Sequence, residues 1–321
     1  MKKIILIIFS FNLLFSDNCN LENNRYKEIC NNIKKEVDIE YIKSYFNQKK
    51  KEIVDKNTLK LINKKYIKKH RLAEKKANRI MLSQKNINKI INHIEKYKDY
   101  YKYIENKYHV NKEIIAATLM KETRLGTYVP KHSSYITLNT MLNNKIDNKR
   151  QNRYRKMAKK SIESIIIFCY QNKIEVKKCD FKSSYTGAIG ISQFMPFNLK
   201  LVEPYNNIFD LNNMYVAIAS TANYYYKNNF KYINYKKIYN LNKIIDDWYV
   251  FVNKYKNTTF PINNNKKNTK SFVKLNEFNH NKYNLVYISN IIKNIMRYNN
   301  SSNYALGILN ISYRVYKLEK R

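Results

Sequence analysis

The chain has 321 residues, 44% of them hydrophobic, which is enough for a sizeable core in one large domain or two small ones. It carries 61 Lys and Arg against 24 Asp and Glu, a net charge of +37. With only four glycines, four prolines and no glycine-rich phosphate loop, the sequence excludes collagen-like chains and Rossmann or P-loop nucleotide enzymes, and disfavours a turn-rich β-sandwich.

The positive charge is compatible with an anionic partner, such as nucleic acid, an acidic lipid surface or an acidic polymer. The composition offers a simpler explanation, because Asn, Ile, Lys and Tyr dominate the whole chain and spread the charge without regard to function. The basic clusters at 49–51 and 64–69 are short and interrupted, which is typical of solvated helix faces. We therefore expect no nucleic-acid partner.

The N-terminus has the pattern of a secretory signal over residues 1–16. Two lysines are followed by an apolar stretch that is too short for a comfortable membrane span, and Ser16 is a small residue suited to cleavage. A retained anchor is the alternative. Cys19 also raises a lipoprotein alternative, but the polar residues before it fit a lipid-attachment signal poorly. We expect a soluble exported protein in the periplasm or cell envelope.

The four cysteines would then meet an oxidising compartment. The nearest pairings are Cys19 with Cys30 and Cys169 with Cys179, although the sequence leaves three connectivities open. The five histidines are isolated and lack metal-ligand spacing. We therefore expect no metal site and no cofactor.

The periodicity of apolar residues predicts a series of helices, and no strand run is convincing, so the expected fold class is all-α. The predicted helices span 37–50, 57–82, 86–108, 110–126, 161–172, 213–228, 284–298 and 303–318. A polar loop and a basic helix are expected over 131–158, with irregular chain over 180–198 and 254–282. Asn111 is a plausible N-cap of the helix that Gly126 terminates.

One carboxylate lies on the apolar face of that helix, because Ile115, Leu119 and Glu122 follow helical spacing. Burial and the negative end of the helix dipole both disfavour a charged carboxylate. The pattern therefore predicts a raised pKa for Glu122, suited to a proton donor near neutral pH. A structural ion pair with Arg124 or a nearby lysine is the alternative.

Glycines are so few that Gly126, Gly187, Gly190 and Gly307 each indicate a backbone requirement, either a positive φ or a close approach. Gly187 and Gly190 lie in a segment that also carries Gln193, whose amide can both donate and accept hydrogen bonds. Two glycine-bearing turns and a sheltered acid suggest a cleft that admits a ligand against bare backbone. A tight turn between helices is the alternative.

Two motifs stand out, Glu122-Thr-Arg-Leu-Gly126 and Gly187-Ala-Ile-Gly-Ile-Ser-Gln-Phe-Met-Pro196, and weaker matches at 110–116, 220–224 and 297–305 flank them. Together they resemble the lytic murein transglycosylases of the membrane-bound B type. The resemblance covers roughly residues 80–316. It implies a lysozyme-like helical catalytic core at 86–235, preceded by a signal peptide (1–16) and a helical N-terminal extension (17–85). A variable loop-rich segment (236–282) and C-terminal helices packed on the core (283–321) would follow.

The resemblance also implies residue roles. Glu122 would be the lone catalytic acid and base, and Ser184 would hydrogen-bond the N-acetyl region of the substrate. The expected cleft residues are Gln193, Tyr298, Asn299 and Tyr304, with Gly187 and Gly190 forming the backbone turn. The family often has an acidic calcium loop, but residues 198–210 here offer only Glu203 and Asp210, so calcium is not expected.

The implied reaction cleaves the bond between N-acetylmuramic acid and N-acetylglucosamine and closes a 1,6-anhydro ring. No Asp or Glu occurs between 181 and 202, which fits a single-acid mechanism better than a two-carboxylate glycosidase. A lysozyme-like muramidase that uses water, or a non-catalytic peptidoglycan-binding protein, is the alternative. The expected partner is the peptidoglycan glycan strand, the expected state is a monomer, and peripheral association with the envelope is compatible with the charge.

Overall fold

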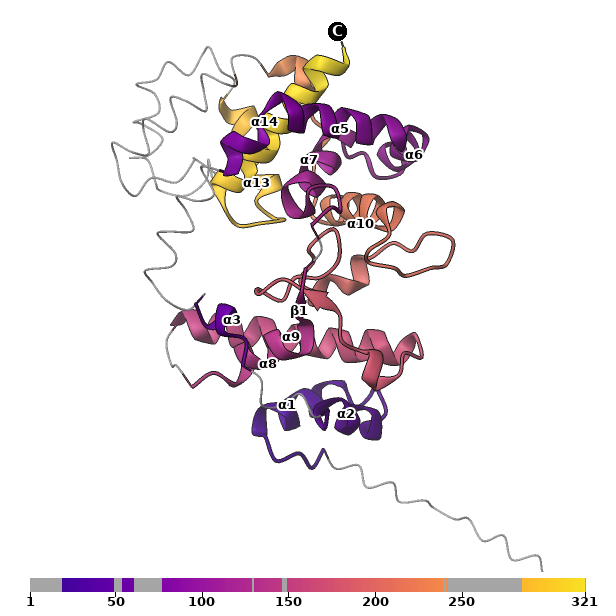
Figure 1. Cartoon of the computed structure of the whole chain (residues 1–321), viewed down its shortest axis with the longest axis vertical. Coiled ribbons are helices and arrows are strands. Elements are labelled where there is room, and N and C mark those ends of the chain that lie inside the picture. The colour runs from indigo at the N-terminus through magenta and orange to yellow at the C-terminus, as the bar shows by residue number, and fades with distance from the viewer. Residues whose placement is uncertain are drawn as a thin grey trace, which may run out of the picture.

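The computed structural model describes residues 19–48, 54–60, 77–128, 130–145, 149–238, 241 and 285–320. These residues are mostly helical, which confirms the predicted all-α class (Figure 1). The predicted signal segment 1–16 lies outside the described residues, as does the whole of the expected loop at 254–282. Among the helices that are described, none combines the length and the apolar character that a membrane crossing needs.

One half of the molecule is built on the pair α8 (Ser134–Asn143) and α9 (Lys149–Gln171), which pack on each other. The N-terminal helices α1 (Asn24–Ile33) and α2 (Ile39–Phe46) cover α9, and the short α3 (Lys56–Lys60) lies on α8 (Figure 1). A single apolar cluster runs through α1, α2, α8 and α9. The N-terminal helices are therefore part of this core and do not form a separate arm.

Two disulfides fasten this half, Cys19–Cys30 and Cys169–Cys179. Both join the nearest cysteines in the sequence, so one of the three open connectivities is realised. The first closes the chain entering α1, and the second closes the turn after α9. Because the sulfur of Cys19 is bonded to Cys30, it is not available for a lipid.

The other half surrounds the helix α7 (Lys112–Thr123), which is buried on nearly every side. The helices packed around it are α5 (Gln84–Lys96), α6 (Lys98–Tyr108), α10 (Met214–Lys227) and α14 (Ser302–Glu319), with α13 (Leu285–Ile295) against α14 (Figure 1). The sequence predicted a single apolar stripe on α7. That prediction was too narrow, because the helix is enclosed by neighbours from both ends of the chain.

Several helix boundaries differ from the prediction. The expected helix at 86–108 is broken at Tyr97, which lets the rings of Tyr97 and Tyr100 both contact Tyr215 of α10 at 5.2 and 5.0 Å. The expected polar loop before the basic helix contains α8, because Asp180 accepts hydrogen bonds from the hydroxyls of Ser133 and Ser134 at the helix start. The sequence analysis also missed α1, which Asn23 caps through the backbone N–H of Arg25.

A small two-stranded sheet joins the two halves, although no strand was predicted. The strands β1 (His132–Ser133) and β2 (Lys182–Ser183) pair antiparallel, with His132 opposite Ser183. Each strand is only two residues long, too short to leave an alternating pattern in the sequence. The 3₁₀ helices η1 (Val176–Lys178), η2 (Pro196–Leu201) and η3 (Tyr235–Lys237) complete the described elements.

The start of α7 corrects the predicted cap. Asn111 occupies the N-cap position, but its side chain makes no capping bond to the helix. Its amide instead donates to the carbonyl of Ile233 (3.0 Å) and accepts from the Ile233 N–H (2.7 Å). Asn111 therefore joins α7 to the chain after α10, and the N–H of Lys112 is satisfied by the Glu105 carboxylate at 3.2 Å.

A buried acid in the first turn of α7 makes stability depend on pH. Burial raises the pKa of Glu113 to about 7, with further upward contributions from the charges of Glu105 and Glu319 and a downward one from Lys112. Between the ordinary pKa of 4.5 and about 7, the folded protein holds a proton that the unfolded chain has released. Stability should therefore fall as the pH rises through this window, by about 3 kcal/mol.

Urea unfolding at pH 5 and pH 8 measures this difference directly. In Glu113→Gln we expect a much smaller fall, because the amide does not titrate. Some slope remains, because burial also raises the pKa of Glu105. Equal falls in the variant and the wild type would contradict the assignment.

Candidate active site

Glu122 lies in the last turn of α7, where the helix emerges from the core. Ile115 and Leu119 below it are fully buried, whereas Glu122 itself is half-buried. The helix ends immediately afterwards, because Arg124, Leu125 and Gly126 all adopt positive φ values. The carboxylate is thus sheltered on its helix side and accessible from the outer side.

The carboxylate of Glu122 is paired with a tyrosine from the far end of the chain. The hydroxyl of Tyr304 in α14 donates to Glu122 Oε1 at 2.5 Å. The ring of Tyr298 lies parallel to that of Tyr304, with centroids 6.5 Å apart. Arg124, the alternative partner considered from the sequence, is exposed. Of the predicted cleft residues, Tyr304 therefore contacts Glu122 directly, and Tyr298 lies against Tyr304.

Three tyrosine hydroxyls lie near this end of α7 and can donate hydrogen bonds. Burial raises the pKa values of Tyr298, Tyr304 and Tyr225 well above 10, and the negative charge of Glu122 raises them further. The Tyr225 hydroxyl pairs with that of Thr118 at 2.9 Å, one turn before Glu122. These hydroxyls stay protonated at any physiological pH, so Tyr304 always presents a donor to the carboxylate.

The segment with Gly187, Gly190 and Gln193 forms a compact turn beside α7. Gly187 and Gly190 have φ values of +84° and +68°, and Gln193 is also left-handed at +50°. The Gln193 amide donates to the Gly190 carbonyl at 2.8 Å. Gly190 needs to be glycine for a second reason, because an added Cβ would lie 2.7 Å from the carbonyl oxygen of Leu211.

Hydrogen bonds connect this turn to residues that adjoin the Glu122–Tyr304 pair. The hydroxyl of Thr123, next to Glu122, donates to the carbonyl of Ile191 at 3.0 Å. The hydroxyl of Tyr298 donates to the carbonyl of Ser192 at 2.5 Å. The turn, the end of α7 and the segment before α14 are therefore joined by hydrogen bonds beside the carboxylate.

The remaining predicted residues lie less close to the carboxylate pair. Ser184 begins the same turn, where its hydroxyl accepts from the Ala188 N–H (3.2 Å) and pairs with Thr186 (2.7 Å). Asn299 is exposed between α13 and α14. The sequence analysis missed Thr118 and Tyr225, because a hydroxyl and a ring inside apolar helices carry no local signal.

The acids considered for calcium are engaged in other contacts. Glu203 accepts a hydrogen bond from the Asn223 amide at 2.9 Å and forms an ion pair with Lys107 at 3.3 Å. The Asp210 carboxylate accepts from the backbone N–H of Asn212. In the part of the chain that the structure describes, His, Cys, Asp and Glu side chains form no group of three suited to a metal ion.

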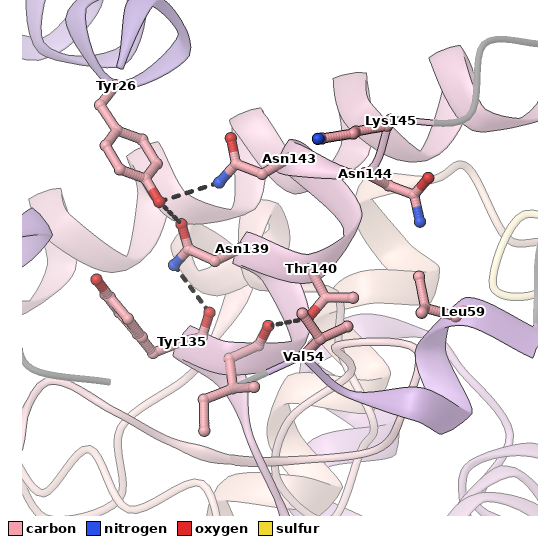
Figure 2. Close-up of a pocket in the computed structure, with 10 residues that line it drawn as sticks. Tyr26, Val54, Leu59, Tyr135, Asn139, Thr140, Asn143, Asn144 and Lys145 are labelled. Carbon is pink, nitrogen blue, oxygen red and sulfur yellow. Dashed lines mark hydrogen bonds between the residues drawn. The ribbon is translucent and has the colours of Figure 1, made fainter. Parts of the chain in front are cut away.

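A cavity of about 320 Å³ lies between α1, α3 and α8. Figure 2 shows its hydrogen-bonded wall, in which the Tyr26 hydroxyl donates to Asn139 (2.7 Å) and accepts from Asn143 (3.0 Å). None of the residues predicted from the sequence lines this cavity. This cavity is therefore separate from the site predicted from the sequence.

A tyrosine-paired glutamate beside a glycine–glutamine turn, held in a helical fold, defines a candidate enzyme that acts on glycosidic bonds. The sequence pattern described as "Transglycosylase SLT domain" matches residues 25–313. The chain belongs to this family. A comparison with curated protein sequences finds no match.

Solved lytic transglycosylases have the same fold. The Escherichia coli enzyme SLT35 in complex with bulgecin A is 16% identical with a TM-score of 0.63, covering 94% of this chain and 95% of that one. SltB1 of Pseudomonas aeruginosa is 15% identical with a TM-score of 0.63, covering 93% and 100%. SltB3 of the same organism, in complex with NAG-anhNAM-pentapeptide, is 13% identical with a TM-score of 0.58, covering 90% and 78%.

Proposed function

We propose that this protein is a peptidoglycan lytic transglycosylase in which Glu122 is the single catalytic acid and base. The observation that carries the proposal is the hydrogen bond between the Tyr304 hydroxyl and the half-buried Glu122 carboxylate, beside the Gln193 turn. Membership of the transglycosylase SLT domain family supports the reaction class. The structural neighbour that carries NAG-anhNAM-pentapeptide supports a glycan substrate.

In the first step, protonated Glu122 donates its proton to the glycosidic oxygen between N-acetylmuramic acid and N-acetylglucosamine. The bond from this oxygen to the muramic C1 breaks, and the N-acetylglucosamine 4-hydroxyl leaves. The negative charge then forms on Glu122, where the Tyr304 hydroxyl stabilises it by hydrogen bonding. This charge appears only as the reaction proceeds, so the interaction favours the transition state.

In the second step, the Glu122 carboxylate removes the proton from the muramic C6 hydroxyl. The C6 oxygen attacks C1 and closes the 1,6-anhydro ring, and Glu122 regains its proton. The step consumes no water. We assign binding roles along the glycan to Ser184, Gln193 and Asn299, which lie on the turn or on the exposed segment before α14.

Digestion of purified sacculi tests the reaction. We expect muropeptides that end in anhydro-muramic acid, each lighter by one water than the reducing product, when the products are weighed by mass spectrometry. Reducing ends alone would identify a muramidase and overturn the transglycosylase assignment. Binding to sacculi without release of fragments would overturn catalysis altogether.

Removing the donor to Glu122 should weaken catalysis without destroying it. In Tyr304→Phe the ring remains in the core but the hydrogen bond is lost, so we expect kcat to fall about 10- to 100-fold with KM little changed. Tyr313→Phe on the same helix is a matched control, because Tyr313 lies about two and a half turns away and is half-exposed. A fall in KM and kcat together in both variants would indicate a general disturbance of α14.

We also propose export to the periplasm or cell envelope, action as a monomer and contact with the envelope through the positively charged surface. The two disulfides support export, because disulfides persist in oxidising compartments. The signal pattern at 1–16 supports the same location.

A further inference from the structure

Asn78 is a buried polar residue from the N-terminal part of the chain that reaches the active-site helices. It is 3% exposed and belongs to a helical stretch at 77–81. Its amide donates to the Asn303 carbonyl in the first turn of α14 at 2.7 Å. Its oxygen accepts a hydrogen bond from the ammonium group of Lys121 in α7. One side chain thus joins the two helices that carry Tyr304 and Glu122.

Lys121 lies between this amide and the catalytic pair. It directly precedes Glu122, and its ammonium group lies 5.6 Å from the centroid of the Tyr304 ring, within the range of a cation–π contact. The Tyr304 ring is thus held by the cation, by the parallel ring of Tyr298 and by its own hydroxyl bond to Glu122.

Gly307 makes room for Asn78. It lies one helical turn after Asn303, and an added Cβ would be 2.6 Å from the amide oxygen and 2.9 Å from the amide carbon of Asn78. The glycine therefore permits Asn78 to lie against the backbone of α14. Glycine lowers stability inside a helix, so its presence here agrees with a specific need for this contact.

We propose that Asn78 and Lys121 are positioning residues that hold the Tyr304 ring so that its hydroxyl stays on Glu122. Neither needs to touch the substrate. Asn78 fixes the ammonium group of Lys121, and Lys121 fixes the ring. The inference rests on the proposed function, because the role that it assigns is the alignment of the pair that performs the reaction. Small errors in such alignment lower kcat strongly.

A double-mutant cycle tests this chain of contacts. Lys121→Met keeps the length of the side chain but removes the cation, and we expect kcat for anhydro-muropeptide release to fall about tenfold with KM unchanged. In a Tyr304→Phe background the same substitution should change kcat by less than about twofold, because the hydroxyl that Lys121 aligns is already absent. An equal loss in both backgrounds would overturn the proposal.

Gly307→Ala provides a second test that leaves Lys121, Tyr304 and Glu122 unchanged. The new methyl group displaces Asn78, so we expect kcat to fall about fivefold in the wild type and to remain unchanged in Tyr304→Phe. If Lys121→Met fails to fold, Gly307→Ala still tests whether Asn78 and Lys121 position the Tyr304 ring. Lys85→Met, at an exposed lysine of α5, is the matched control and should retain full activity.

The activity of the wild type and of Gly307→Ala separates the proposed enzymatic function from the positioning role of Asn78 and Lys121. A wild type that releases no anhydro product would overturn the proposed function and this inference together. An active wild type in which Gly307→Ala keeps its full kcat would overturn the inference alone.

Discussion

Glu122→Gln is expected to abolish release of anhydro-muropeptides, lowering kcat about 1,000-fold or more. The amide has nearly the same shape and still accepts the Tyr304 hydroxyl, but it can neither donate an acidic proton nor remove one. The fold should be retained, since Glu122 is half-buried at a helix end and outside the apolar core. Product release from sacculi and the thermal unfolding midpoint measure the two effects separately.

Glu36→Gln is the matched control, because Glu36 is an exposed glutamate after α1. It makes the same chemical change far along the chain from the site and should leave kcat unchanged. If Glu122→Gln kept more than about a tenth of the wild-type rate, another group would have to supply the proton. The single-acid mechanism would then be wrong.

Gly190→Ala should destabilise the protein by about 2–4 kcal/mol. The φ of +68° is unfavourable for alanine, and the new Cβ would lie 2.7 Å from the backbone oxygen of Leu211 and 2.8 Å from its Cβ. The carbonyl oxygen of Leu211 also accepts a hydrogen bond from the Ile191 N–H at 2.9 Å, so Leu211 cannot move away without breaking that bond. Urea unfolding at constant pH measures the loss.

Asn207→Ala isolates the backbone contribution. Asn207 also has a positive φ, +63°, but it is exposed, so alanine there meets strain without a steric clash. We expect a cost of about 1 kcal/mol or less. If the two variants lost equal stability, the close approach of Leu211 would not matter, and the requirement for glycine at position 190 would be conformational only.

The sequence was most informative where the chemistry is local. Helical periodicity was sufficient for α7, α10 and α14, and the scarcity of glycine drew attention to Gly187 and Gly190, both of which adopt left-handed backbone conformations. The motif around Glu122 led to the family to which the chain belongs.

Contacts between residues that are far apart in the sequence could not be predicted from the sequence alone. Asn111 has the form of a helix cap, but tertiary packing gives its amide to Ile233, 122 residues away. No spacing rule pairs Tyr304 with the Glu122 carboxylate, and none places Asn78 between α7 and α14. Short strands such as β1 and the helix α8 depend on Asp180, which becomes their neighbour only in the folded chain.

The origin of the Tyr304 hydroxyl has a consequence for biosynthesis. It comes from the final described helix, 182 positions after the acid with which it pairs. A polypeptide still being synthesised contains the acid and the glutamine turn before it contains the phenol. The hydrogen-bonded pair can therefore be assembled only after residue 304 has been added, so a chain interrupted before that residue has the acid without its hydrogen-bond donor.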